Sequence, residues 1–334
     1  MTRKLTVACA VLLALIIVFG GCGKPKQQAA GTKGKRTIVF VFKLVGIPYS
    51  NVCQKGAEQA AKELGVNVEF TGPAKGGDVA GQVRIIENQI SRGVDAIVIS
   101  PNDPNAVKPV IEKAMRRGIK VFTWDSDAPE TKRIFYVAAA DDVGIGEDIM
   151  DRLAKDVGGK GKVGIMSGSQ GALNLNQHVE GVLKALKKYP NIELAKPILN
   201  NNDQPQLAQS GMAGLLQRYP DLAGIACVSS PGPPGAARAV IAAGKAGKVK
   251  IWGLSLPSEN RQYLKDGTVN GLILWDPAKL TFLTAKLVND YLDGKQPTDG
   301  MEVKGVGKLK VSKNGIIIMP GVVITKENVD QFDF

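Results

Sequence analysis

The sequence predicts an α/β protein of two doubly wound parallel-sheet lobes, and three observations lead to this fold class. The chain has 334 residues, of which 44% are hydrophobic, enough for one large core or two smaller ones. Short apolar runs alternate with amphipathic, helix-like segments. The alternation occurs twice, over 37–138 and 139–275, and each half is long enough for a sheet of its own.

The predicted strands are nearly continuous apolar runs, which is typical of parallel strands covered by helices on both faces. They cover 37–42, 66–70, 95–100, 120–124, 134–138, 162–167, 224–229, 250–255 and 271–275. The predicted helices are amphipathic, and many end at a glycine in the C-cap position. They cover 53–65, 83–93, 106–118, 179–190, 207–220 and 280–294, before a strand-prone tail over 301–334.

The first 21 residues predict an export signal. Arg3 and Lys4 precede an uncharged apolar run from Leu5 to Phe19, which is shorter than the roughly 20 residues of a membrane span. Small residues precede Cys22, as a lipoprotein signal peptidase requires, so we expect Cys22 to carry lipid and to hold the protein on the outer face of the membrane. An ordinary cleaved signal or an uncleaved anchor is the alternative, because Phe19 is unusual at its position.

Residues 22–36 predict a basic, flexible tether that is attracted to anionic lipid. Of the formal charge of +12, two positive charges lie in the signal and five in the tether, which leaves +5 on residues 37–334. That remainder forms no basic stripe with interleaved aromatic residues, so no nucleic-acid partner is expected.

The cysteine and histidine content indicates no metal site and no cofactor. Cys9 is removed with the signal, and Cys53 and Cys227 lie in ordinary core patterns, which favours two buried thiols over a disulfide. The chain has no CxxC motif and one histidine, His178, which we expect to be a surface or loop-packing residue.

Polar side chains gather where the predicted strands end, and ligands of open parallel sheets bind beyond those ends. Carboxylates, amides and hydroxyls beside aromatic rings suit a polyhydroxylated ligand. We expect Trp124 to be core, and for Tyr49 and Trp275 both core packing and stacking on a ligand remain open. The candidate ligand-binding residues are Lys43, Tyr49, Ser100, Asn102, Asp125, Asp127, Asn174, Asn176, Asn202, Ser229, Ser230, Ser255, Trp275 and Asp276.

Catalytic alternatives lack their machinery. Asp125 and Asp127 are neighbours on one loop, whereas a glycosidase needs two carboxylates facing across the scissile bond, and Asp127 suits a turn or helix cap. No G-x-S-x-G elbow accompanies the histidine. The G-x-G-x-x-G match at 159–164 precedes a strand instead of following one, and no P-loop occurs. We expect a binding protein and no enzyme.

Several short motifs in order resemble one family. "FKLVG" at 42–46, "VFTWDSD" at 121–127, "LWD" at 274–276 and "ENVDQFDF" at 327–334, together with "TGP" and "VAGQVRIIENQI" within 71–90, are similar to sugar-type periplasmic binding proteins, the solute receptors of ABC importers. The motifs are most similar to the rhamnose-binding and autoinducer-2-binding (Lsr-type) branch. The resemblance covers 37–334 and adds a permease as partner and a monomeric, non-catalytic receptor that traps its ligand by lobe closure.

The family fold, type I, implies three hinge segments, which we place near 138–140, 274–277 and 308–312. The N-terminal lobe would then comprise 37–138 and 276–308. The C-terminal lobe would comprise 139–275 and 309–334.

The resemblance carries two ligand contacts over directly, Lys43 and Asp125. An Asp-Gln pair of the autoinducer-2 receptors reads Asn174-Leu175 here, and the positions whose main chain helps to bind that signal hold Val228 and Ser230. The arginine and second aspartate of ribose receptors are missing near Asn176 and Ser255. We therefore expect another monosaccharide or small polyol, with autoinducer-2 as the alternative. We also expect Asp125→Ala to leave the melting temperature of the unliganded protein unchanged.

Overall fold

The computed structural model describes residues 35–304, 306–312, 315–317 and 321–334, and Lys35–Phe334 form one compact unit. The predicted signal, Cys22 and the tether up to residue 34 lie outside the described residues. None of the helices in the described part of the chain is long and apolar enough to cross a bilayer.

The first sheet has seven strands in the order β14-β15-β5-β4-β3-β1-β2. Its strands pair in parallel except β14 with β15. The strands are β1 Thr37–Val41, β2 Asn67–Thr71, β3 Ala96–Ile99, β4 Lys120–Trp124, β5 Tyr136–Ala138, β14 Lys310–Ser312 and β15 Gly315–Ile317. Four helices cover it and complete what we call the first lobe: α1 Pro48–Leu64, α2 Val79–Arg92, α3 Pro104–Arg116 and α9 Pro277–Leu292.

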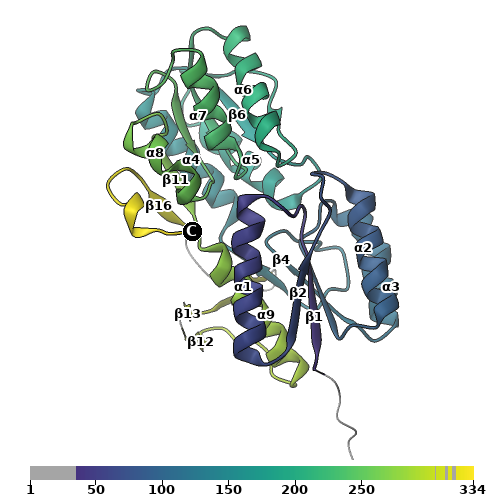
Figure 1. Cartoon of the computed structure of the whole chain (residues 1–334). Coiled ribbons are helices and arrows are strands. Elements are labelled where there is room, and N and C mark those ends of the chain that lie inside the picture. The colour runs from purple at the N-terminus through teal and green to yellow at the C-terminus, as the bar shows by residue number, and fades with distance from the viewer. Residues whose placement is uncertain (1–34, 305, 313–314, 318–320) are drawn as a thin grey trace, which may run out of the picture. The chain divides into compact units, whose positions relative to one another are not determined.

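Alternate residues of the central strand β1 enter two different cores. Phe40 belongs to the core that includes residues of α1 and α9, whereas Val39 packs with residues of α2 and α3. Helices α1 and α9 accordingly lie side by side, and so do α2 and α3 (Figure 1). A strand buried on both faces needs the continuous apolar sequence that predicts it.

The second sheet runs in the order β16-β11-β10-β9-β6-β7, with β8 also paired to β6. All pairs are parallel except β11 with β16. Its strands are β6 Gly161–Ser167, β7 Ile192–Leu194, β8 Leu199–Asn200, β9 Leu222–Cys227, β10 Lys250–Gly253, β11 Gly271–Leu274 and β16 Val322–Ile324. The second lobe comprises this sheet and α4 Asp142–Asp156, α5 Leu173–Leu186, α6 Pro205–Arg218, α7 Gly232–Ala242 and α8 Pro257–Lys265.

The two predicted lobes are confirmed, each with a parallel-dominated sheet covered by helices. A short antiparallel pair, β12 Glu302–Val303 with β13 Gly307–Lys308, lies apart from both sheets, and a 3-10 turn over Val329–Gln331 follows β16. The chain passes between the sheets from β5 to α4, from β11 to α9 and from β15 to β16.

The predicted place of the third crossing, 308–312, is wrong. Strands β14 and β15 belong to the first sheet, so residues 310–312 and 315–317 do not join the second lobe as the sequence suggested. Ile316 pairs with Val137 of β5, which covers backbone groups that would otherwise form an open sheet edge. The second sheet receives only the later strand β16.

Other sequence predictions about the core hold. Cys53 and Cys227 are buried free thiols, and burial raises the pKa of each. Trp124 is fully buried, with its ring centroid 5.2 Å from that of Phe40 and 5.4 Å from that of Phe42.

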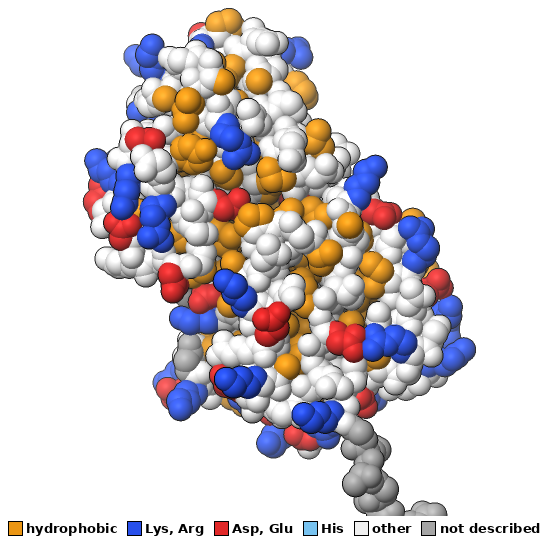
Figure 2. All heavy atoms as spheres, viewed as in Figure 1, with side chains coloured by type: hydrophobic (Ala, Val, Ile, Leu, Met, Phe, Trp, Pro, Cys, Tyr) orange, Lys and Arg blue, Asp and Glu red, His pale blue; other side chains and the backbone are white. Residues whose placement is uncertain are grey.

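On the face shown in Figure 2, basic and acidic side chains are interspersed.

Candidate functional site

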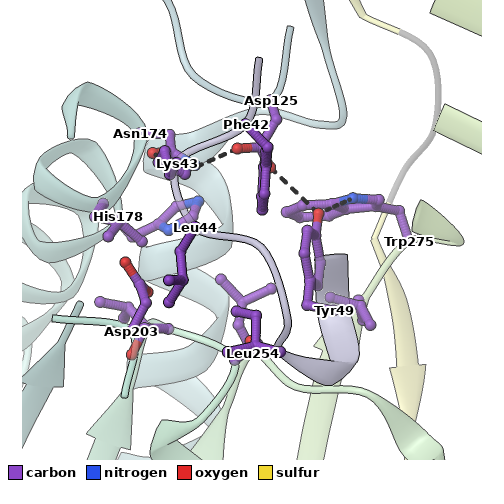
Figure 3. A pocket seen from close by; sticks show the side chains of 16 residues that line it. Phe42, Lys43, Leu44, Tyr49, Asp125, Asn174, His178, Asp203, Leu254 and Trp275 are labelled. Carbon is purple, nitrogen blue, oxygen red and sulfur yellow. Dashed lines mark hydrogen bonds and ion pairs between the residues drawn. The ribbon is translucent and has the colours of Figure 1, made fainter. Parts of the chain in front are cut away.

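One cavity lies at the carboxyl ends of the strands of both sheets. It encloses about 500 Å³ of space that no atom fills, part of it open to solvent. Figure 3 shows the residues that line it. They are Phe42, Lys43, Leu44, Ile47, Tyr49 and Asp125 of the first lobe, Asn174, Leu175, His178, Asp203, Val228, Ser229, Ser230, Leu254 and Leu274 of the second, and Trp275 between β11 and α9.

A buried carboxylate organises the first-lobe wall. Lys43 follows β1 and Asp125 follows β4, and the Lys43 Nζ lies 2.8 Å from the Asp125 Oδ2. The Ser100 hydroxyl donates to the same oxygen at 2.8 Å, and the Tyr49 hydroxyl donates to Oδ1 at 3.2 Å. Both members of the ion pair are less than a tenth exposed, so the pair is screened little by solvent. The carboxylate is held in place before any ligand arrives.

The network extends across to the second lobe and to the α9 crossing. The Lys43 Nζ donates to the Asn174 Oδ1 at 3.2 Å, which joins β1 of the first lobe to α5 of the second. The Trp275 Nε1 donates to the Tyr49 hydroxyl at 3.1 Å (Figure 3). Burial, and then the charge of Asp125, raise the pKa of Tyr49 well above its usual value. The phenol therefore stays protonated and able to donate.

The backbone at Asp125 is in the left-handed region, with φ of 59°. Aspartate tolerates this conformation better than most residues, at a modest energetic cost. The turn that results brings Trp124 and Ser126 into an isolated β-bridge. Strained backbone of this kind is concentrated at functional sites.

Asp127 does not line the cavity, although the sequence made it a candidate. Its two oxygens accept from the Arg133 Nε and Nη2, each at 2.6 Å, and Oδ1 also accepts from the Thr123 hydroxyl and the Ala128 amide. The hydrogen bond from the Ala128 amide agrees with the predicted role of Asp127 in a turn. A bidentate, mostly buried ion pair leaves this carboxylate to hold its own loop.

Three candidates stand behind the cavity wall. Ser100 supports Asp125 as described, and the Asn102 Nδ2 donates to the Lys43 carbonyl at 2.9 Å. The Ser255 hydroxyl donates to the Ser230 carbonyl at 2.6 Å. These side chains position the lining residues and do not themselves line the cavity.

Three further candidates lie outside the cavity. Asp276 caps α9, accepting from the amides of Ala278 and Lys279. Asn176 is exposed, because on α5 it lies away from the face that carries Asn174 and His178. Asn202, with φ of 48°, packs its backbone against the loop before α2 and is replaced at the cavity by its neighbour Asp203.

His178 is the clearest omission. The sequence suggested a surface or loop-packing residue, yet the side chain is 1% exposed and lines the cavity. It lies one helical turn after Asn174 on α5, and this spacing was the signal that could have found it. Its Nε2 is 2.9 Å from the Asp142 Oδ1 at the start of α4.

Asp203 and the apolar wall were also missed. Burial raises the pKa of Asp203, against the attraction of Lys43. Apolar side chains make up much of the lining, which a search for polar strand ends does not detect. They are Phe42, Leu44, Ile47, Leu175, Val228, Leu254 and Leu274.

The arrangement can bind but shows no reaction machinery. Among the described residues no group of three or more metal-ligating side chains occurs. Lys43 and Asp125 are paired with each other, Asp203 carries a further carboxylate, and hydroxyls and amides surround them. Such a cavity suits a small ligand with hydroxyl groups on one side and apolar atoms on the other.

Comparison with known proteins agrees with this geometry. A family model described as "Periplasmic binding protein domain" matches residues 38–296. The D-ribose/D-allose-binding protein of Pseudomonas aeruginosa is 29% identical over 247 residues, which cover 72% of this chain and 77% of that protein.

Two solved structures are similar over nearly the whole described chain. An ABC transporter solute binding protein from Clostridium phytofermentas with bound L-rhamnose has a TM-score of 0.83 at 26% identity, covering 90% of this chain and 98% of its own. LsrB from Clostridium saccharobutylicum in complex with AI-2 has a TM-score of 0.80 at 26% identity, covering 89% and 100%. The similarities confirm the predicted resemblance, the type I fold and the expectation of a binding protein instead of an enzyme.

Proposed function

This chain belongs to the family of periplasmic binding protein domains, and from this membership we propose that it is an exported receptor of an ABC importer that traps a monosaccharide or similar small polyol. The observation that carries the proposal is the buried Lys43–Asp125 pair, which faces an apolar second-lobe wall across a cavity at the strand ends. Ionised Asp125 accepts ligand hydroxyls, and the apolar side chains cover the C–H face of a sugar ring.

Ligand capture would proceed by closure of the two lobes. The bond from Lys43 to Asn174 supports this mechanism, because it joins the lobes directly at the cavity. A ligand that contacts both walls stabilises the closed form over the open one, and the population shifts accordingly. The closed receptor, as a monomer, would then dock on a membrane permease.

The sequence of the N-terminal segment supports a proposal about location. We propose that Cys22 carries lipid and anchors the receptor to the outer face of the membrane. Incorporation of labelled palmitate in the producing cells tests this step. Cys22→Ser should abolish the incorporation and release the protein from the membrane fraction, while an unchanged membrane fraction without label would favour an uncleaved anchor.

A second candidate function is reception of autoinducer-2. The similarity to LsrB, with Lys43 and Asp125 both at the cavity, favours it. Leu175 counts against it. Those receptors have a glutamine at this position, and a leucine cannot replace its hydrogen bonds. The two candidates share the fold and the first-lobe wall, so only ligand identity separates them.

A thermal-shift panel of the purified mature protein decides between them. At 100 times its dissociation constant a ligand stabilises by about 2.7 kcal/mol, which corresponds to a rise in melting temperature of roughly 5 °C. We expect such a rise with L-rhamnose, D-ribose, D-allose or a related monosaccharide. A rise with autoinducer-2 alone would make the chain a signal receptor, and no rise with any of these would refute the proposed function.

A further inference from the structure

Two polar side chains of the second lobe line the cavity with bonding capacity left over. In the first lobe, the oxygens of Asp125 already accept from Lys43, Tyr49 and Ser100. The His178 Nδ1, in contrast, is buried and has no hydrogen-bond partner among the described residues. The half-buried Asp203 carboxylate is hydrogen-bonded to the backbone of Ser169 and has no ion-pair partner among them. A buried polar atom without a partner, such as the His178 Nδ1, is rare in folded proteins and calls for an explanation.

The second ring nitrogen of His178 sets the chemistry of the first. Its Nε2 lies 2.9 Å from the Asp142 Oδ1, and a carboxylate accepts a hydrogen at that distance. The neutral ring then carries its proton on Nε2 and a free lone pair on Nδ1. In this form of the ring His178 is a hydrogen-bond acceptor at Nδ1, and the partner that Nδ1 lacks is a donor.

The backbone conformation and a neighbouring glycine fix the position of the Asp203 carboxylate. Asn202 and Asp203 are consecutive left-handed residues, with φ of 48° and 59°. A Cβ on Gly168 would stand 2.3 Å from the Asp203 Oδ1, so the glycine makes room for this carboxylate. Figure 3 shows both Asp203 and His178 among the residues that line the cavity. The left-handed backbone at Asn202 and Asp203 and the absence of a side chain at Gly168 both position the Asp203 carboxylate.

We propose that the His178 Nδ1 and the Asp203 carboxylate are the second-lobe polar contacts of the ligand and select a sugar that offers a hydroxyl hydrogen to each. This inference rests on the proposed function. The side chains of Leu175 and Val228, which line the same cavity, cannot bond to a hydroxyl, so the ligand needs apolar atoms between or beyond the two donors. A sugar with a deoxy position at that edge fits this pattern of acceptors and apolar walls.

Two variants of His178 separate the proposed ligand contact of Nδ1 from the contact of Nε2 with Asp142. The amide nitrogen of His178→Gln can occupy the Nε2 position and keep the bond to Asp142, but the variant has no acceptor in place of Nδ1. The amide oxygen of His178→Asn can occupy the Nδ1 position, but this variant loses the bond to Asp142. Isothermal titration with L-rhamnose, D-ribose and D-allose is compared with the melting temperature of each unliganded variant.

We expect His178→Gln to bind at least tenfold more weakly with little change in melting temperature. His178→Asn should melt lower yet lose less affinity than His178→Gln. Asp203→Asn, which still tolerates a positive φ, should also lose about tenfold, since a hydrogen bond to a charged acceptor is lost. Asp276→Asn is the matched control, because asparagine caps a helix as well as aspartate does and the residue lies outside the cavity.

Deoxy analogues of the sugar that binds best give the sharpest test. One monodeoxy analogue should lose affinity for the wild-type protein but bind His178→Gln as tightly as the parent sugar does, because the missing bond is already absent. If the wild-type protein binds a sugar and His178→Gln binds it equally well, this inference is overturned and the proposed function stands. If the wild-type protein binds none of the ligands in the thermal-shift panel, both fall.

Discussion

The carbonyl oxygen of Asn202 lies so close to Gly76 that a Cβ atom on the glycine would stand 1.8 Å from it. Gly76 precedes α2 in the first lobe and Asn202 precedes α6 in the second. A second pair repeats the relationship, since a Cβ on Gly171 of the second lobe would stand 2.4 Å from the Asn102 carbonyl oxygen of the first. Backbone meets backbone across the lobes at both places, and only glycine allows it.

Alanine at Gly76 or Gly171 should therefore oppose closure without harming either lobe. Neither residue has a positive φ, so alanine fits the open form. We expect a loss of sugar affinity of at least tenfold, an unchanged melting temperature of the unliganded protein, and a smaller ligand-induced fall in the radius of gyration by small-angle X-ray scattering.

Two glycines provide controls for this prediction. Gly214→Ala on α6 meets no atom within 4 Å and should bind normally and melt slightly higher. Gly56→Ala on α1 would meet the Ala278 carbonyl oxygen of α9 at 2.1 Å within one lobe and should lower the melting temperature. Wild-type affinity in Gly76→Ala would show that this contact is not part of the closed form.

Asp125→Ala should abolish tight ligand binding and also destabilise the unliganded protein. The second effect corrects the expectation from sequence, because the structure places Asp125 in a buried network instead of on a free cleft wall. Removing the carboxylate leaves the Lys43 charge buried and unpaired, which costs about 3–5 kcal/mol. Chemical denaturation of both proteins without ligand measures this cost.

The double variant Asp125→Leu/Lys43→Met distinguishes charge from shape. Replacing a buried ion pair with apolar residues is often neutral for stability, so most of the lost free energy of unfolding should return. Ligand affinity should not return with it. A double variant as unstable as Asp125→Ala would mean that packing or the positive φ of residue 125, and not the unpaired charge, causes the defect.

Asp127→Ala should lower the free energy of unfolding without weakening sugar binding. The ion pair with Arg133 is mostly buried and remote from the cavity lining, so its loss should lower the free energy of unfolding by about 3 kcal/mol. Sugar affinity, measured by titration well below the melting temperature, should stay within about twofold of the wild-type value. A strong affinity loss with unchanged stability would return Asp127 to the ligand site.

Glu259 on α8 should make stability depend on pH. Burial raises its pKa from 4.5 to about 7, with Arg238 acting in the opposite direction. The folded protein therefore holds this proton more tightly than the unfolded chain, so the contribution to stability is present below pH 4.5 and is lost as the pH rises to 7. Glu259→Gln should match the wild type near pH 4.5 and exceed its free energy of unfolding at pH 8 by roughly 1–2 kcal/mol. Equal stability of the two proteins at pH 8 would contradict the raised pKa.

Strand ends were predictable from sequence because apolar runs mark them, and Lys43 and Asp125 were found in this way. The conformation of the loop after each strand was harder to predict. Asp125 and Asp127 are two residues apart, but the positive φ at Asp125 turns the chain between them and sends one carboxylate to the cavity and the other to Arg133. No local pattern announces such a turn at an aspartate.

Long-range pairing was the other limit. His178 lies where α5 packs against α4, and a contact between two helices leaves no mark at the strand ends of the sequence. The tail strands β14 and β15 read correctly as strand-prone, yet β5, with which β15 pairs, lies about 180 residues earlier in the chain. Propensity identifies a strand but not the sheet that it joins.

Trp275 gives the molecule a built-in optical reporter. Its indole stands where the chain passes from β11 to α9, lines the cavity and is hydrogen-bonded to Tyr49, whereas Trp124 is sealed in the first-lobe core and Trp252 bonds to Asp156 away from the cavity. Indole emission responds to the polarity and hydrogen bonding around the ring. Occupancy of the cavity should therefore be visible as a change in intrinsic fluorescence, with no dye attached and with the emission of two other tryptophans as a constant background.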